Sequence, residues 1–381
     1  MLSTPVAPLG SGLGGGVELT IINLAKMLVQ RGHQVVIAAP EGSILPAAAT
    51  LGADKFTQQI ALIQVPGTLQ PIAQNQLRSA SITVASALAN AWDYARQAQA
   101  QYDLLVNFAY DWLPFYLTPF LSVPVAHFVT MGSLSDAMDE AIAQLSARFP
   151  GTLGAYTQSQ ADTFSTHIPS TDPLATSPIY WEILGSAIEI DQYDCCDHPT
   201  RELAWAGRIS PEKGLEDAIA AAIQARRSLN IFGKVEDGCY WQQIQRQIQQ
   251  QCEAADSVSI SYRGFLATPE LQQALGNCQA LLVTPRWIEA FGMVAIEALA
   301  CGVPVIAYRR GGLAEIVRHN QTGYLVEPDD IEALVDAIAR VDQLDRWACR
   351  QQAESMYSLA KWAERFEQWF YKIISNPVFS P

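Results

Sequence analysis

The sequence predicts an α/β protein made of two doubly wound parallel-sheet domains, and three observations support this prediction. Extended and helical patterns alternate along almost the whole chain, as they do when crossover helices connect parallel strands. A polar, strand-poor segment at residues 188–200 separates two such series. The length of 381 residues allows two domains that each bury their own core. We therefore expect a ligand cleft between the domains, at the carboxyl ends of the strands.

The first domain is predicted at residues 1–187 and opens on a weak strand, Met1 to Val6. Pro5 lies inside this strand, which is unusual for a central strand, and a first strand normally has about five or six residues. A start of the natural chain upstream of Met1 therefore stays open. The glycine-rich loop at 10–16 then leads into a helix, whose apolar residues recur at helical spacing up to Gly32.

Further strands are predicted where short apolar runs are bounded by turn residues. In the first domain these runs are Val35–Ala39, Leu104–Phe108, Val123–Val129 and Leu153–Tyr156. Residues 188–200 form the predicted linker, and residues 201–359 form the second domain. Its predicted strands are Leu203–Ala206, Ser228–Phe232, Val258–Tyr262, Ala280–Val283, Val303–Ala307 and Gly323–Val326.

The composition excludes several classes of protein. The net charge is −14, from 24 basic and 38 acidic residues, and neither nucleic acid nor an anionic membrane attracts such a surface. No uncharged apolar stretch approaches the roughly 18 to 20 residues that span a bilayer, and the N-terminus lacks a signal-peptide profile. We expect a soluble, cytoplasmic protein.

The cysteines and histidines predict no metal site. The seven cysteines are dispersed, without a C-x-x-C pair or a histidine at ligand spacing, so free thiols are expected. The five histidines and the aspartates form no compact cluster of metal ligands. We expect chemistry that needs neither a metal nor a cofactor.

Two loops carry candidate binding residues. Arg208 and Lys213 lie between Gly207 and Gly214, in a loop that follows a strand and precedes a helix. Two cations fixed at the mouth of a parallel sheet can hold a diphosphate through charge-assisted hydrogen bonds. A surface loop with incidental charges is the alternative.

The second segment sets Glu289 and Glu297 eight positions apart, where an apolar strand gives way to a helix at Met293–Leu299. Free amides at a helix start favour an anion, and carboxylates accept hydrogen bonds from sugar hydroxyls. On this segment alone, a capping glutamate followed by a solvated one explains the pattern equally well.

Taken together, the motifs resemble the retaining nucleotide-sugar glycosyltransferases of GT-B fold, in glycosyltransferase family 4, the glycogen synthase-like group. The segments that carry the resemblance are Gly15-Gly16-Val-Glu18, Arg31 to Val35, Gly207 to Gly214, Gly264-Phe265, Pro285 to Val305, Gly311 to Ile316 and Thr322 to Val326. They cover nearly the whole chain. The resemblance implies two Rossmann-like domains facing an interdomain cleft. It also implies that a last helix, at about 360–381, packs back on the first domain and buries its apolar stripe.

The resemblance assigns most of the donor site to the second domain. Arg208 and Lys213 would bind the diphosphate, Glu297 the ribose and Glu289 the transferred hexose. The backbone around Gly264 and Phe265 would contact the nucleobase. The remaining implied donor contacts are the backbone at Phe291, Gly292, Met293 and Val294, with Gly15 and Gly16 closing from the first domain.

His127 matches the histidine that this family places near the hexose, so a catalytic role is expected for it beside Glu289, Arg208 and Lys213. A buried structural histidine is the alternative. Because the family offers no agreed nucleophile, the implied mechanism is front-face transfer without a metal, in which the leaving phosphate oxygen takes the acceptor's proton. Stabilisation of that leaving group would supply the catalysis.

The first domain is expected to bind the acceptor. Segments 3–20, 107–114 and 131–134 resemble the cyanobacterial pteridine glycosyltransferases, which move glucose from UDP-glucose to tetrahydrobiopterin. Aromatic residues beside polar ones can stack and bond a flat heterocycle, although ordinary helix packing explains them as well. The candidate acceptor residues are Glu18, Asn107, Tyr110, Asp111 and Trp112.

Three alternatives stay open. One is the same fold with a sucrose, sterol or lipid-type acceptor and another nucleotide sugar, although no basic amphipathic helix for membrane docking is evident. Another is a protein that binds a nucleotide sugar without transferring it. The third is an NAD-dependent oxidoreductase, because Gly10-x-Gly12-x-x-Gly15 satisfies the dinucleotide fingerprint and Glu41 ends the next strand.

Overall fold

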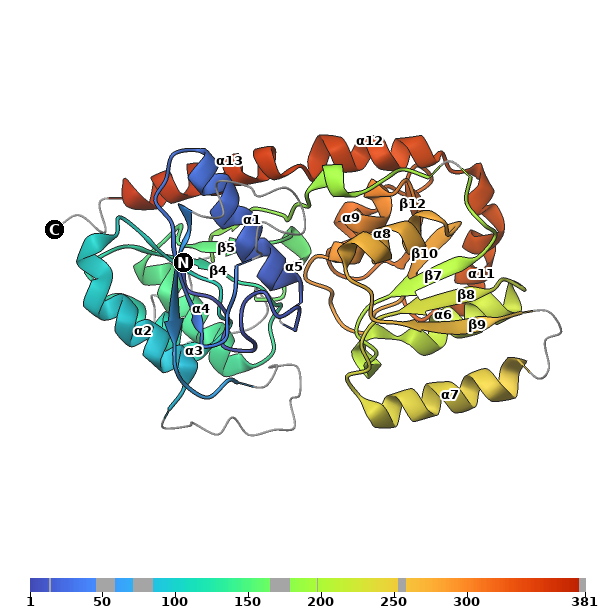
Figure 1. Ribbon diagram of the computed structural model, residues 1–381, viewed down its shortest axis with the longest axis horizontal. Helices are drawn as coiled ribbons and strands as arrows, with labels where there is room; N and C mark the ends of the chain where they lie inside the picture. The colour runs from blue at the N-terminus through green and yellow to red at the C-terminus, as the bar shows by residue number, and fades with distance from the viewer. Residues whose placement is uncertain are drawn as a thin grey trace. The chain divides into compact units, whose positions relative to one another are not determined.

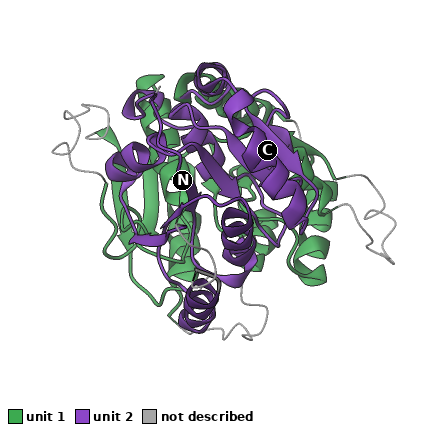
Figure 2. Cartoon of the chain, turned by 90° about the vertical axis from the view of Figure 1, so that its right-hand side faces the viewer, with its two compact units in different colours: residues 1–186, 359–381 green, residues 187–358 purple. Residues whose placement is uncertain are grey.

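The protein folds into two compact α/β units (Figures 1 and 2). The computed structural model describes residues 1–13, 15–45, 59–70, 85–164, 179–196, 198–252 and 258–376. Unit 1 contains Met1–Ser186 together with Leu359–Pro381, and unit 2 contains Ala187–Ser358. All pairings between the described strands are parallel, so the predicted fold class of two Rossmann-like domains is confirmed.

The strands of unit 1 form a four-stranded and a two-stranded parallel sheet. The four-stranded sheet runs in the order β3 (Leu105–Asn107), β4 (Val125–Phe128), β5 (Leu153–Ala155) and β6 (Trp181–Ile183). The other pairs β1 (Val36–Pro40) with β2 (Ala61–Val65). Strands β2 and β6 are additions to the predicted set, and their partly exposed residues weaken the apolar pattern that marks a buried strand.

The N-terminal segment connects these two sheets. Leu2 N donates to Val106 O at 2.8 Å, and Ser3 N donates to Ala38 O at 3.0 Å, so residues 1–3 lie between β3 and β1. The segment forms isolated bridges rather than the full strand predicted at Met1 to Val6. Pro5 has no N–H with which to extend the ladder.

The helices of unit 1 cover its sheets and include the last helix of the chain. Their bounds are α1 (Gly16–Gln30), α2 (Ala87–Ala98), α3 (Trp112–Leu117), α4 (Asp136–Arg148), α5 (Gln158–Asp162) and α13 (Leu359–Ile374). The apolar stripe of α13 is buried within this unit. Trp369 Nε1 donates to Gly151 O at 2.8 Å, and a Cβ on Gly154 would lie 2.8 Å from the Trp369 ring. Only glycine at 154 therefore allows the ring to approach β5 so closely.

Unit 2 is a six-stranded parallel sheet in the order β12-β11-β10-β7-β8-β9. Its strands are β7 (Leu203–Ala206), β8 (Leu229–Phe232), β9 (Ile260–Gly264), β10 (Ala280–Val283), β11 (Val305–Tyr308) and β12 (Gly323–Val326). Its helices are α6 (Leu215–Gln224), α7 (Gly238–Cys252), α8 (Thr268–Gly276), α9 (Met293–Ala300), α10 (Leu313–Ile316), α11 (Ile331–Arg340) and α12 (Arg346–Met356). The strand order reverses between β7 and β10, which is where ligands bind in doubly wound sheets.

Three other features of the described residues bear on the sequence analysis. Residues 188–196 and 198–200, from the predicted linker, belong to unit 2. No described helix is long and apolar enough to cross a bilayer. Within the described ranges, no group of three or more metal-ligating side chains is placed to hold an ion, and six cysteines are free thiols.

Candidate functional site

Two loops meet at the switch point of unit 2. Residues 207–214 follow β7 and residues 284–292 follow β10, and these two strands pair directly. Thr284 Oγ1 donates to Gly214 O at 2.7 Å. Gly214 has a φ of 61°, and a Cβ on it would lie 2.1 Å from Thr284 O. The close contact of the loops therefore requires glycine at 214.

Lys213 and Glu289 are brought together by these loops. Lys213 Nζ lies 2.6 Å from Glu289 Oε2, and Trp287 Nε1 donates to the same oxygen at 3.1 Å. The Lys213 ammonium also lies 4.8 Å from the centroid of the Trp287 ring. The side chains of Lys213 and Glu289 are 19% and 14% exposed, so both reach solvent while being fixed in position.

Arg208, the other predicted cation, lies at the same edge of the sheet. Its guanidinium forms an ion pair with Glu236, from the loop after β8, and a second one with Glu212 at 3.1 Å. Both cations that the sequence predicts as diphosphate ligands are therefore paired with carboxylates in this structure.

Helix α9 begins at a sharp glycine turn. Gly292 precedes it with a φ of 103°, and no side chain caps its first turn. The turn is held from the next loop, because Gly312 N donates to Glu289 O at 2.7 Å. A Cβ on Gly311 would lie 2.2 Å from the same oxygen. The amides of Met293 and Val294 thus form an uncapped helix start, which favours an anion.

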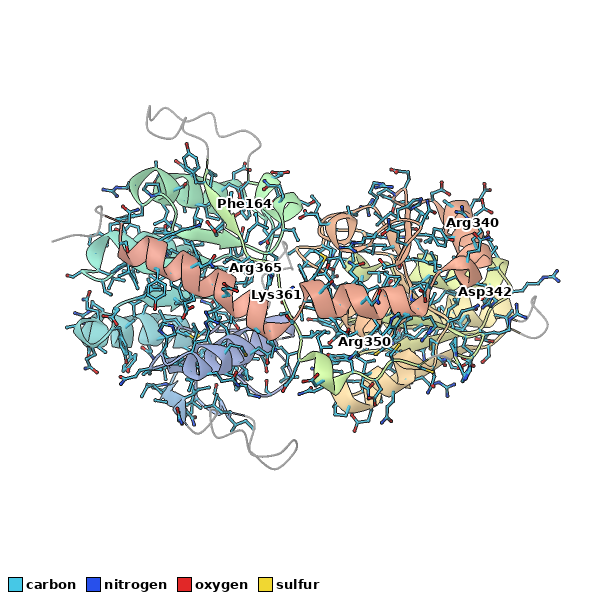
Figure 3. All side chains as sticks on the ribbon, turned by 90° about the horizontal axis from the view of Figure 1, so that it is seen from above. Phe164, Arg340, Asp342, Arg350, Lys361 and Arg365 are labelled. Carbon is cyan, nitrogen blue, oxygen red and sulfur yellow. The ribbon has the colours of Figure 1, made fainter. Side chains whose placement is uncertain are left out.

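Glu297 lies one turn further along α9. Tyr193 OH donates to Glu297 Oε1 at 3.3 Å. Burial raises the pKa of the Glu297 carboxyl above its ordinary value, and the hydrogen bond from Tyr193 opposes this effect. Arg350 of α12, labelled in Figure 3, donates to Ala300 O at 2.8 Å. This contact satisfies a carbonyl at the C-terminal end of α9 and so fixes the helix that carries Glu297.

Gly264 and Phe265 lie at the carboxyl end of β9. Gly264 ends the strand with a φ of 81°, and Gly233 N donates to its carbonyl at 2.9 Å. The Phe265 side chain is 64% exposed. The predicted nucleobase residues are therefore on the same edge of the sheet as Arg208, and β8 lies between β9 and β7.

In unit 1, Glu18 binds the glycine-rich loop of its own chain. Its Oε2 accepts hydrogen bonds from Gly10 N at 3.0 Å and from Gly12 N at 3.1 Å. These are amides that a dinucleotide phosphate would need, so the geometry disfavours the oxidoreductase alternative. Glu18 therefore shapes this loop, and the acceptor role predicted for it stays a prediction. Gly15 precedes α1 with a φ of 65°, and Gly16 is the first residue of the helix.

His127 and Asn107 lie in the buried interior of unit 1. The side chain of His127 is 0% exposed; its Nδ1 lies 3.2 Å from Asn107 Nδ2 and its Nε2 lies 2.8 Å from Thr118 Oγ1. Burial lowers the pKa of His127 to about 3, so the ring is neutral. Asn107 also bonds both polar atoms of the Ala109 backbone. In this structure both side chains bond to groups of the protein itself, and the catalytic role of His127 and the acceptor role of Asn107 stay predictions.

Three predicted acceptor residues lie around the start of α3. Asp111 Oδ1 accepts from Leu113 N at 2.9 Å and caps the helix, while burial raises the pKa of its carboxyl. Tyr110 is half-buried beside Phe164, with 6.5 Å between their ring centroids. Trp112 is 48% exposed and stacks on Tyr116 with 4.4 Å between centroids. Of the predicted acceptor residues, Trp112 offers the most exposed ring surface.

Four side chains that hold this site together were not predicted from the sequence: Tyr193, Glu212, Glu236 and Trp287. Tyr193 lies in the segment predicted as a linker. Glu236 follows β8. Because consecutive strands often lie side by side in a doubly wound sheet, the loop after β8 could have been expected next to the loop after β7. No pattern in the sequence places Trp287 against Lys213.

Comparisons with known proteins identify the family. Residues 14–129 match the family model described as Glycosyltransferase Family 4, and residues 197–356 match the one described as Glycosyl transferases group 1. The structure of Anabaena HepE in complex with UDP-glucose superimposes with a TM-score of 0.70 at 18% identity, covering 97% of this chain and 98% of that one. The chain belongs to the GT-B glycosyltransferases.

Similar glycosyltransferases differ in the activities that their names state. The GDP-mannose-dependent phosphatidylinositol monomannoside mannosyltransferase of Mycobacterium tuberculosis is 32% identical over 158 residues, which are 39% of this chain and 40% of that protein. Glycogen synthase of the same species is 35% identical over 147 residues, 37% of this chain and 33% of the enzyme. The alignments thus span two fifths or less of these relatives. The D-inositol 3-phosphate glycosyltransferase of Mycolicibacterium paratuberculosis is 26% identical over 88% of this chain and 79% of its own length.

Proposed function

We propose that this GT-B glycosyltransferase moves glucose from UDP-glucose to a tetrahydropterin, with retention of configuration at the anomeric carbon. The observation that carries the proposal is the cluster at the switch point of unit 2. There Lys213 contacts Glu289 beside an uncapped helix start, and Arg208 lies at the end of the same strand pair.

The donor fits this cluster group by group. Arg208, Lys213 and the amides at the start of α9 bind the diphosphate, since guanidinium, ammonium and N–H groups all donate to phosphate oxygens. Glu297 accepts from the ribose hydroxyls, and Glu289 accepts from hydroxyls of the transferred hexose. Phe265 offers its exposed ring to the nucleobase. UDP is favoured over GDP because HepE, similar over its whole length, was solved with UDP-glucose.

The proposed mechanism needs no protein nucleophile. The bond from the anomeric carbon to the phosphate oxygen breaks, the acceptor oxygen bonds to the same face, and its proton moves to the departing phosphate. Arg208 and Lys213 stabilise the charge that develops on the diphosphate, which is an electrostatic contribution realised mainly in the transition state. Glu289 then orients the hexose.

The acceptor assignment rests on unit 1. Trp112 presents an exposed indole stacked on Tyr116, and a pterin ring can stack on its open face. Residues 107–114 form one of the segments that resemble the pteridine glycosyltransferases. They include Trp112 and the candidate acceptor residues Tyr110 and Asp111. A different small-molecule or lipid acceptor is the second candidate, because the mannosyltransferase relative acts on a phosphatidylinositol monomannoside.

A transfer assay tests the proposal. The purified protein is incubated with UDP-glucose, ADP-glucose or GDP-mannose, each with and without tetrahydrobiopterin, and the products are identified by mass. We expect a pterin hexoside from UDP-glucose alone. Loss of hexose from GDP-mannose instead would overturn the donor, and donor hydrolysis without a pterin product would overturn the acceptor.

A further inference from the structure

The loops after β7 and β8 are joined by their backbones next to Arg208. Ile209 N donates to Lys234 O at 2.9 Å, and Glu236 N donates to Ile209 O at 3.2 Å. Ile209 is completely buried, so this junction is anchored in the core of unit 2. The backbone therefore fixes the start of the Glu236 side chain beside Ile209. Ile209 directly follows Arg208 in the adjoining loop.

From this position Glu236 forms an ion pair with Arg208. The two side chains are 29% and 33% exposed, so the pair is open to solvent and to a competing anion. Glu212 also contacts Arg208, at 3.1 Å, but it lies in the same loop and is held by Ser210 Oγ at 2.7 Å. Glu236 comes from the next loop, and a rotation of its side chain is enough to release the guanidinium.

A diphosphate and a carboxylate compete for the same face of Arg208. Both anions accept hydrogen bonds from the planar guanidinium group. That group of Arg208 already pairs with the carboxylates of Glu212 and Glu236. A resident carboxylate must therefore leave when the phosphate binds, and it returns when the phosphate departs. The nucleoside diphosphate product carries more charge at the phosphates than the donor, so these ligands attract it more strongly, and a competing anion offsets part of that attraction.

We infer that Glu236 is a displaceable counter-ion of Arg208 that weakens nucleotide binding and speeds the release of the diphosphate product. This inference rests on the proposed function, in which Arg208 binds the diphosphate. Glu236 is then a positioning residue that acts through Arg208, and it does not contact the reacting carbon.

The test measures UDP binding to the full chain at fixed ionic strength. Glu236→Gln keeps the size of the side chain and removes its charge, so the Kd for UDP should fall about fivefold. Most of the change should appear as slower dissociation, because affinity changes within one site reside mainly in the off-rate. Glu270→Gln, an exposed acid in the first turn of α8, changes the charge of unit 2 equally and serves as the control.

Two further variants separate this inference from the function on which it rests. Arg208→Ala should lose most UDP affinity, and Arg208→Ala with Glu236→Gln should gain nothing over Arg208→Ala alone. If Glu236→Gln binds and releases UDP like Glu270→Gln, while Arg208→Ala is impaired, the counter-ion role is wrong and the phosphate site stands. If Arg208→Ala binds UDP as tightly as the wild type, the phosphate assignment itself is wrong.

Discussion

At the scale of single residues, Lys213 is the most direct test of the donor site. Its ammonium is fixed between Glu289 and the Trp287 ring, where it can meet charge that develops on a leaving diphosphate. Lys213→Ala should lower kcat about a hundredfold, the scale for losing one preorganised donor to a developing anion. Steady-state turnover with UDP-glucose checks this. Lys234→Ala, an exposed lysine in the next loop, should turn over like the wild type.

The burial of Glu297 predicts that the stability of the folded protein depends on pH. Burial raises the pKa of its carboxyl, so the folded state binds this proton more tightly than the unfolded state does. The stability that this proton contributes is fully present below the pKa of the carboxyl in the unfolded state. It is lost as pH rises through the higher pKa of the folded state. Glu297→Gln still accepts from Tyr193 but carries no charge, so its advantage over the wild type should grow as pH rises above the ordinary pKa of a glutamate.

Denaturant midpoints at several pH values measure this difference, and UDP affinity is the companion measurement. The same variant should bind UDP more weakly at neutral pH, because a neutral amide accepts less strongly from the ribose hydroxyls. A stability difference that stays constant with pH would contradict the role of the buried charge.

Single residues also show which parts of the site can be predicted from the sequence and which cannot. Arg208, Lys213 and Glu289 were predictable because glycines and strand ends place them at one edge of a parallel sheet. The surroundings of His127 were not predictable, because its sequence neighbours look the same whether the ring faces a ligand or Asn107 and Thr118. The contacts of Glu18 could not be predicted for a similar reason, since its partners are backbone amides that no sequence pattern displays.

At the scale of elements, buried strands were the most predictable. β7, β10 and β12 have the bounds that the apolar runs predict, because these strands are covered on both faces. The edge strands β2 and β6 carry exposed residues, and the first strand is interrupted by Pro5, so their patterns were weak or misleading.

Helix α13 gives a prediction about packing. Its Trp369 is 1% exposed, bonds Gly151 O and lies over Gly154. Trp369→Ala should destabilise unit 1 by about 3–5 kcal/mol, the usual cost of truncating a buried tryptophan. Chemical unfolding followed by far-UV circular dichroism measures this. Gln368→Ala, the exposed neighbour on the same helix, should change the free energy of unfolding by less than about 0.5 kcal/mol.

Between Phe366 and Trp369, charge also ties α13 to the rest of unit 1. Glu367 lies 2.6 Å from His33 Nε2 and is bonded by the Arg31 guanidinium, and these hydrogen bonds lower the pKa of its carboxyl. A carboxyl with a lowered folded pKa contributes stability above its unfolded pKa and loses it as pH falls through the folded one. Glu367→Gln should therefore cost unit 1 stability at neutral pH and less in acid, as measured by unfolding midpoints across that range.

At the scale of the whole molecule, the two units have separate hydrophobic cores. A chain of this kind need not unfold in one step, so calorimetry should resolve two transitions. Trp369→Ala identifies the transition of unit 1, because only that one should move to lower temperature. The other transition then belongs to unit 2.

UDP should raise the transition of unit 2 and leave that of unit 1 nearly in place, because the charged diphosphate and ribose ligands proposed, Arg208, Lys213 and Glu297, lie within Ala187–Ser358. A ligand that binds only the folded state stabilises it by about 2.7 kcal/mol at a hundred times its Kd. NAD should shift neither transition, since Glu18 occupies amides of the glycine loop that a dinucleotide would need. A UDP shift confined to unit 1 would contradict the assignment of the donor site, and a shift with NAD alone would restore the oxidoreductase alternative.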